Sequence, residues 1–131
     1  MSDTLVLKKL TVRAVLVPLR RPVIAGIGRF DSWPLILLDL DLSDGIVGRS
    51  YVAPYRAAAV GAVIAELRDL ENIFKGKPIA PFDAFEGAMK ALNVVGVTGM
   101  STIATSALDM AIWDGLAKAA GLPCFIRKKE N

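Results

Sequence analysis

The sequence contains no histidine and only one cysteine, Cys124, among its 131 residues. The absence of histidine excludes His-based catalytic triads, histidine general bases and metal sites with imidazole ligands. A lone cysteine excludes a disulfide scaffold and a thiolate zinc site. A single buried thiol suits a reducing compartment, so we expect a cytoplasmic protein. The length also excludes a complete (β/α)8 barrel, which needs about 250 residues.

The chain also lacks long apolar runs and a strong charge of one sign. Its longest apolar stretches, near residues 35–38 and 57–65, are far shorter than the roughly 18 residues of a membrane span. No basic segment followed by a long apolar stretch opens the sequence, so we expect no signal peptide. Sixteen Lys and Arg against thirteen Asp and Glu give a net charge of +3. No basic stripe is interleaved with aromatic residues, so we expect no nucleic-acid partner. The short apolar runs likewise lead us to expect no membrane partner.

Apolar periodicity predicts strands first and helices afterwards. Alternation of apolar and polar residues indicates strands over residues 5–19, 33–42 and 46–52, with a tight turn at Ser43-Asp44-Gly45. This order predicts an α+β fold, in which a three-stranded antiparallel meander is followed by three helices packed on it.

Three helices are predicted from apolar residues at helical spacing, over residues 56–74, 83–93 and 101–120. Asp83 is the expected N-cap of the second helix, and Ser101 or Thr102 that of the third. The expected buried seam of the third helix consists of Ile103, Ala107, Met110, Trp113 or Ala117, and Ala120.

The predicted loop at residues 20–32 has an unusual composition. Pro22, Gly26 and Gly28 interrupt the strand pattern, yet four large apolar residues lie among them: Val23, Ile24, Ile27 and Phe30. Loops are usually polar because they lie in water. Two interpretations follow from the residues alone, a loop packed on its own domain or a lid over an apolar ligand. The hydrophobic fraction of 53% also fits either a plain core or a face that needs a partner.

The short motifs that could indicate a binding or catalytic site are only weak evidence for one. Gly26 and Gly28 resemble half of a dinucleotide-binding fingerprint, but no helix follows them, so we reject that function. Asp39 and Asp41 share one strand face, a pattern that is compatible with acid–base or cation chemistry and more typical of a solvated face.

Two further carboxylates and one tyrosine complete the candidates. Asp109 and Asp114 lie on the third helix, Asp109 close to the expected seam, and we interpret both as structural. Tyr51 lies at the end of the third strand, where its ring either covers a ligand or is an ordinary strand-end aromatic.

The run from Asp109 to Pro123 resembles the signature D-x-A-x-W-D-x-x-x-K-x-x-G-x-P. That signature closes the N-terminal capping domain in the mandelate racemase and muconate lactonizing enzyme branch of the enolase superfamily. The order of meander, apolar loop, Asp-Gly turn and Gly48-Arg-Ser-Tyr51 agrees with it. Val17-Pro18-Leu19 and Pro22-Val23 are most similar to mandelate racemase. We therefore expect residues 1–123 to be a capping domain and residues 124–131 to be an atypical basic tail.

The resemblance implies a Mg²⁺-dependent racemase (an isomerase) or dehydratase (a hydro-lyase) that removes the proton α to the carboxylate of a small carboxylic acid. A barrel domain would carry the metal ligands and the bases, and the capping domain would close the site with two loops. Matched residue by residue, Val23, Ala25, Ile27 and Phe30 would lie on the first loop and Tyr51 on the second. Together they would form an apolar wall near the substrate, which favours the lid interpretation.

The sequence departs from the family pattern after Pro123, where a barrel domain would begin. The family's metal ligands and bases are missing, so we expect no catalytic residue, no metal-binding residue and no cofactor bound by this chain. We expect the chain alone to be inactive and its apolar face to self-associate in place of a missing or separate barrel domain. A frameshift, a truncated gene or cleavage would each give such an ending. A non-catalytic interaction module and a non-functional fragment are the alternatives.

Overall fold

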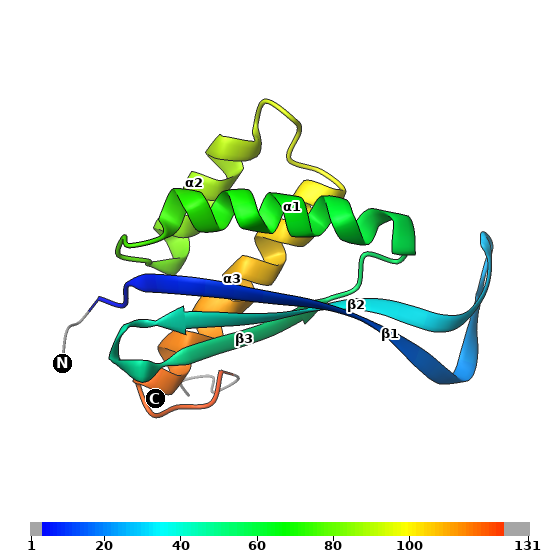
Figure 1. Ribbon diagram of the computed structural model, residues 1–131, viewed down its shortest axis with the longest axis horizontal. Helices are drawn as coiled ribbons and strands as arrows, with labels where there is room; N and C mark the ends of the chain where they lie inside the picture. The colour runs from blue at the N-terminus through cyan, green and yellow to red at the C-terminus, as the bar shows by residue number, and fades with distance from the viewer. Residues whose placement is uncertain (1–3, 125–131) are drawn as a thin grey trace, which may run out of the picture.

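The fold is seen in a computed structural model that describes residues 4–124 (Figure 1). Strands β1 (Leu7–Ala25), β2 (Gly28–Leu42) and β3 (Val47–Val52) form one antiparallel sheet in the order β1-β2-β3. Helices α1 (Ala57–Phe74), α2 (Pro81–Leu92) and α3 (Met100–Ala119) follow. The predicted α+β fold, a meander followed by three helices, is confirmed, and no barrel forms within residues 4–124. Of the predicted tail, residues 124–131, all but Cys124 lie outside the described part of the chain.

Helices α1 and α3 cover one face of the sheet. Helix α1 contacts β1 and β2, α3 contacts β2 and β3, and α2 packs on α3. The alternation of β2 explains the arrangement, because Ile36, Leu38 and Leu40 are fully buried whereas Leu37 and Asp39 between them are partly exposed. The opposite face of the sheet, which carries Leu37 and Asp39, is therefore left open.

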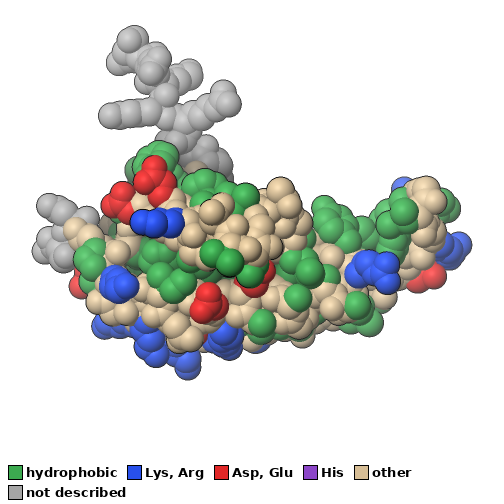
Figure 2. Space-filling view, turned by 90° about the horizontal axis from the view of Figure 1, so that it is seen from above, with side chains coloured by type: hydrophobic (Ala, Val, Ile, Leu, Met, Phe, Trp, Pro, Cys, Tyr) green, Lys and Arg blue, Asp and Glu red, His purple; other side chains and the backbone are tan. Residues whose placement is uncertain are grey.

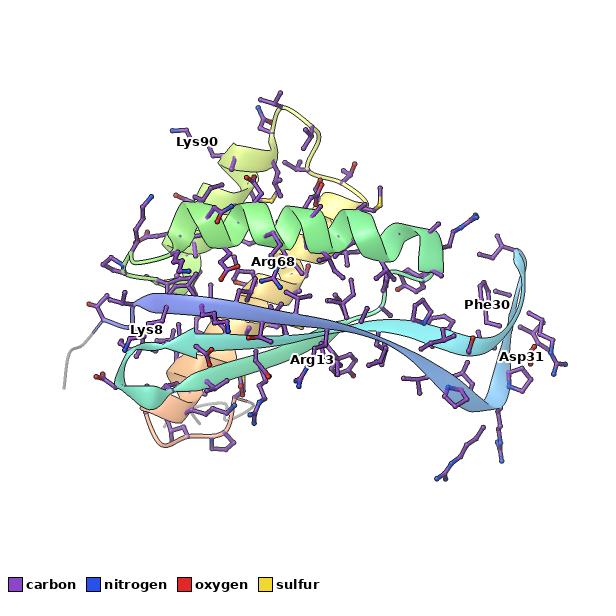
Figure 3. All side chains as sticks on the ribbon, in the orientation of Figure 1. Lys8, Arg13, Phe30, Asp31, Arg68 and Lys90 are labelled. Carbon is purple, nitrogen blue, oxygen red and sulfur yellow. The ribbon has the colours of Figure 1, made fainter. Side chains whose placement is uncertain are left out.

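A buried carboxylate fastens α1 to the edge strand β1. Glu71 Oε1 accepts the backbone N–H of Leu10 at 2.8 Å. Arg68 Nη1 donates to Glu71 Oε2 at 3.0 Å and to the Leu10 carbonyl at 2.7 Å (Figure 3 labels Arg68). The carboxylate and the guanidinium thus satisfy each other and the backbone, which makes the buried charge tolerable.

The prediction of a loop at residues 20–32 is wrong, because β1 and β2 continue through this segment as a hairpin. Val23 pairs with Phe30 and Ala25 pairs with Gly28, which leaves only residues 26–27 as the turn. The register shifts between Pro18 and Val23. A bulge at this point accommodates a proline-containing segment on an edge strand, where a missing backbone N–H costs no ladder hydrogen bond.

The predicted start of the second helix is also wrong. Helix α2 begins at Pro81 with Ala80 as its N-cap, so Asp83 lies in the first turn and does not cap it. Proline suits this position because the first N–H groups of a helix have no intrahelical acceptor.

Helix α3 differs from its prediction at its cap and along its seam. It begins after Gly99, and Ser101 instead donates a hydrogen bond to Glu66 Oε1 at 2.9 Å, so neither Ser101 nor Thr102 is the N-cap. Met110 and Trp113 are exposed and do not belong to the buried stripe. The buried positions are mostly small or aliphatic: Ala104, Ala107, Leu108, Ala111, Ile112 and Gly115.

Candidate functional site

The end of the β1–β2 hairpin, residues 16–34, projects beyond the helices as an arm. Figures 1 and 2 show it extending to the right of the body, and in Figure 2 hydrophobic side chains lie along it. At its outer end side chains on both faces are exposed, Ile24 to 79% and Ile27 to 83%. Four of the predicted site residues lie at its outer end: Val23, Ala25, Ile27 and Phe30.

Three aromatic rings connect the arm to the body. The ring of Trp33 meets those of Phe30 and Tyr55 edge to face, with centroids 5.6 Å apart in both pairs. Tyr55 has φ 64°, and the N–H of Arg56 donates to the Pro54 carbonyl at 2.7 Å across it. This three-residue γ-turn is a rare geometry for an aromatic residue. The Tyr55 side chain is 59% exposed, and its edge-to-face contact with Trp33 links the turn to the arm.

A cleft separates the arm from the start of α1. It has a volume of about 540 Å³ and lies between Leu16, Ile27 and Phe30 on the arm and Tyr55 and Arg56 beside α1. Its arm side is apolar, and Arg56 is a cation at its other edge. The cleft is large enough to hold a small organic molecule or an apolar side chain of a neighbouring surface.

Tyr51 lies far from the arm tip. It is opposite Leu37 on β3 and is 65% exposed on the open face of the sheet. Phe30 lies seven residues from Leu37 along β2, which corresponds to about 23 Å of strand. The structure therefore divides the five predicted site residues into two groups, four on the arm and Tyr51 at the open face.

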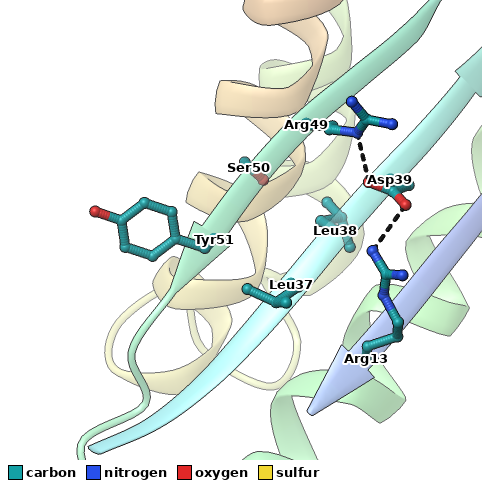
Figure 4. A pocket seen from close by; sticks show the side chains of 7 residues that line it. All are labelled: Arg13, Leu37, Leu38, Asp39, Arg49, Ser50 and Tyr51. Carbon is teal, nitrogen blue, oxygen red and sulfur yellow. Dashed lines mark hydrogen bonds and ion pairs between the residues drawn. The ribbon is translucent and has the colours of Figure 1, made fainter. Parts of the chain in front are cut away.

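Beside Tyr51, two arginines share one carboxylate (Figure 4). Arg13 Nη2 donates to Asp39 Oδ2 at 2.9 Å, and Arg49 Nε donates to Asp39 Oδ1 at 3.1 Å. The sequence indicated only a solvated strand face at Asp39 and missed both arginines. Antiparallel pairing was the signal that could have found them. Once the register is known, Arg49 lies directly opposite Asp39, and Arg13 lies opposite Leu37, two residues along the same face of β2.

Asp114 and Lys118, two residues of the signature, join α3 to β3. Asp114 Oδ2 accepts the backbone N–H of Arg49 at 2.8 Å, and Lys118 Nζ donates to Asp114 and, at 2.8 Å, to the Val47 carbonyl. Burial raises the pKa of Asp114, but the hydrogen bonds and positive charges of Lys118 and Arg49 outweigh it and hold the pKa below its ordinary value. The interpretation of Asp114 as structural agrees with these contacts.

Asp109 lies in a different electrostatic environment on the same helix. Burial raises the pKa of its carboxyl group, and a hydrogen bond from Trp113 opposes the rise only in part. The ring of Trp113 also meets Phe82 of α2 edge to face, with centroids 5.9 Å apart.

An apolar groove runs between β3 and the end of α3. Its volume is about 620 Å³, and Tyr51, Met110, Trp113 and Cys124 contribute to its wall. Cys124 is exposed, so the expectation of a buried thiol is wrong. The groove had no sequence signal of its own, because Met110 and Trp113 occupied the predicted core seam.

The fit of a metal ion and of a membrane can be judged for residues 4–124 only. In that range no three His, Cys, Asp or Glu side chains are placed to hold a metal ion, so the described residues do not fit the Mg²⁺ that the family implies. In the same range no helix has the length and apolar character needed to cross a bilayer.

Comparison with known proteins gives a family and a set of similar structures. Residues 8–125 match the family described as mandelate racemase / muconate lactonizing enzyme, N-terminal domain. An enolase from the alpha-proteobacterium BAL199 with bound magnesium is 44% identical, with a TM-score of 0.84 over 89% of this chain. An enolase from Bradyrhizobium complexed with magnesium and mandelic acid is 33% identical, with a TM-score of 0.84 over 92% of this chain.

A more distant match shares the fold alone. The L-talarate/galactarate dehydratase from Salmonella typhimurium is 24% identical, with a TM-score of 0.77 over 93% of this chain. The chain spans about a third of the length of these proteins, between 32% and 34%.

Proposed function

The chain belongs to the family of mandelate racemase / muconate lactonizing enzyme N-terminal domains, and on this basis we propose that residues 1–123 are the capping domain of a Mg²⁺-dependent enzyme acting on a small carboxylic acid. A barrel domain, as a separate or adjoining partner, would supply the metal and the groups that remove the α-proton, in a racemisation or a dehydration. The residues described here contribute binding, positioning and exclusion of water. A cytoplasmic location is part of the same proposal.

The observation that carries this proposal is the apolar arm. Ile24 and Ile27 are almost fully exposed at its end, and the edge-to-face contact of Trp33 with Tyr55 links it to the body. A large exposed apolar surface on a small domain is typical of a surface that functions against a partner. We propose that the arm covers the mouth of the barrel, with Ile27 and Phe30 against the side group of the substrate.

Tyr51 would then act at a second position rather than in the same wall. It borders the groove that contains Trp113 and Cys124, so a barrel domain seated on this groove would meet Tyr51 on its rim. The mandelic acid bound to the Bradyrhizobium relative supports a substrate with an aromatic side group. An apolar arm offers such a group contact area and few hydrogen bonds.

A chimera tests the proposal. Residues 1–123 are fused to the barrel domain of the Bradyrhizobium relative, and exchange of the α-proton of mandelate is followed by NMR in D₂O with Mg²⁺. We expect exchange well above that of the barrel alone, and a loss of about tenfold in kcat/KM for Ile27→Asp, since a charge would replace apolar contact. Val94→Asp, at an exposed site between α2 and α3, is the matched control. A folded chimera with no more exchange than the barrel alone would contradict the proposal.

A further inference from the structure

The Arg13–Asp39–Arg49 cluster has hydrogen-bonding capacity that the chain itself does not use. Both oxygens of Asp39 are occupied, one by each arginine, and this side chain is only 21% exposed. The arginine side chains are 60% and 66% exposed. Each guanidinium donates through one nitrogen to Asp39 and has no other acceptor within residues 4–124. The cluster therefore presents unused guanidinium N–H donors and one net positive charge to the solvent.

Leu37 and Tyr51 add an apolar surface beside these donors. Arg13, Leu37 and Tyr51 form one row across the three strands, since Arg13 pairs with Leu37 and Leu37 pairs with Tyr51. Together with Arg49 they line a hollow of about 390 Å³ on the open face of the sheet (Figure 4). Its volume lies in the usual range of small-molecule sites, where a few polar groups direct a ligand against apolar walls.

We propose that this hollow binds the carboxylate of a small organic acid with an apolar body, without a metal ion. Arg13 and Arg49 would donate to the carboxylate, and the apolar body would pack on Leu37 and the ring of Tyr51. A carboxylate matches the planar guanidinium better than a spherical anion does, because two parallel hydrogen bonds form. Asp39 is a positioning residue that holds both guanidiniums at the same edge of the hollow. The site does not depend on a barrel domain, so it stands or falls separately from the function proposed above.

The arm offers a matched comparison. Arg29 Nε donates to Asp31 Oδ1 at 2.9 Å, and the Arg29 side chain is 62% exposed, close to the values for Arg13 and Arg49. It contains one arginine for one carboxylate, carries no net charge and borders none of the hollows described above. Arg29→Gln therefore removes the same charge from the chain as Arg13→Gln without touching the proposed site.

The test is an NMR titration of the 131-residue chain with sodium benzoate. We expect saturable shifts at Arg13, Leu37, Arg49 and Tyr51, with millimolar affinity. Arg13→Gln and Arg49→Gln should each weaken binding about tenfold, because a charge-assisted hydrogen bond is lost. Arg13→Lys keeps the charge and loses the planar fork, so it should also weaken binding. Arg29→Gln should leave the affinity unchanged.

Several outcomes would overturn the proposal. Benzamide, which has the shape of benzoate without its charge, must bind far more weakly, and equal binding would show that no carboxylate is recognised. An equal loss in Arg29→Gln would show that only net charge matters. If inorganic phosphate bound more tightly than benzoate, the hollow would be a general anion site and not a site for a carboxylate with an apolar body. A backbone spectrum that is preserved in each variant confirms that the loss is not due to unfolding.

Discussion

Gly48 on β3 lies directly against Ala111 on α3, so closely that a Cβ at position 48 would be 2.0 Å from the Ala111 carbonyl oxygen. Gly115 lies one turn further along α3, and a Cβ there would be 2.5 Å from Leu42 Cδ1. These two glycines let the helix approach the sheet. The approach brings the carboxylate of Asp114 within hydrogen-bond distance of the β3 backbone, so this part of the signature encodes how α3 docks on β3.

We expect Gly48→Ala to destabilise the fold by about 3 kcal/mol, because the added methyl group meets backbone atoms that have no room to move. Urea unfolding followed by circular dichroism measures the change. Gly61→Ala is the control, since Gly61 lies in α1 with nothing within 4 Å of an added Cβ. It should stabilise the chain by about 0.5 kcal/mol through helix propensity. A similar effect of both substitutions would contradict the account of the α3–β3 contact.

Asp114→Asn should lower stability near neutral pH and have little effect in acid. The folded pKa of Asp114 is held below its ordinary value, so its ionised form favours the folded state. That contribution is present above about pH 4 and is lost as the pH falls through the folded pKa. Urea midpoints of both proteins across this range measure the difference, which should shrink towards low pH. A difference that is constant with pH would show that the carboxylate charge plays no part.

Asp109→Asn should change the stability near neutral pH in the opposite direction, towards a more stable protein. Burial raises the folded pKa of Asp109, so the unfolded chain loses this proton at a lower pH than the folded chain does. Ionisation then costs stability as the pH rises from about 4 through the folded pKa. The asparagine variant should be the more stable protein near neutral pH and lose that advantage in acid, since its amide oxygen still accepts from Trp113. Parallel pH profiles for the variants at positions 109 and 114 would refute the assignment.

The strands and helices that cover a core were predictable from the sequence, whereas the arm was not. Alternation reveals a strand only where one face is buried, as at Ile36, Leu38 and Leu40 in β2. In the outer part of the arm, residues 20–29, both faces are exposed, so the pattern carries no alternation, and Gly26 and Gly28 favour a loop. The hairpin is defined by backbone pairing, from Val23 with Phe30 to Ala25 with Gly28.

The candidate site was predictable only where single residues could be matched to a family motif. Tyr51 and the arm residues were identified by resemblance, and their roles remain predictions. The Arg13–Asp39–Arg49 cluster required the strand register, which one sequence does not determine. On α3 the apolar residues surround the whole helix, so Met110 and Trp113 could not be told from core positions. Small residues such as Ala111 face the sheet because only they allow its close approach.

The turn at Tyr55 predicts that a glycine variant is more stable than an alanine variant at this position. Tyr55→Ala removes the ring from Trp33 but keeps a side chain at φ 64°. Tyr55→Gly removes the ring and also relieves the backbone, so it should be more stable than the alanine variant by about 1 kcal/mol. Urea unfolding gives the order, and Trp33 fluorescence in a Trp113→Phe background reports the loss of the ring contact. An alanine variant as stable as the glycine variant would show that the turn relaxes without cost.

Self-association through the arm is the remaining expectation. Leu16, Ile24 and Ile27 are exposed there without a covering element. In the isolated chain their burial requires a second copy, and burying apolar area at about 25 cal/mol per Å² favours it. Sedimentation velocity at micromolar concentration should show species above the 14.0 kDa monomer. The double substitution Ile24→Ser, Ile27→Ser should return the chain to monomer, whereas Val94→Ser, at an equally exposed apolar site away from the arm, should not. If the unmodified chain sediments as a monomer and binds no apolar dye, the arm does not behave as an unpartnered surface, and its exposure would not support docking on a barrel domain.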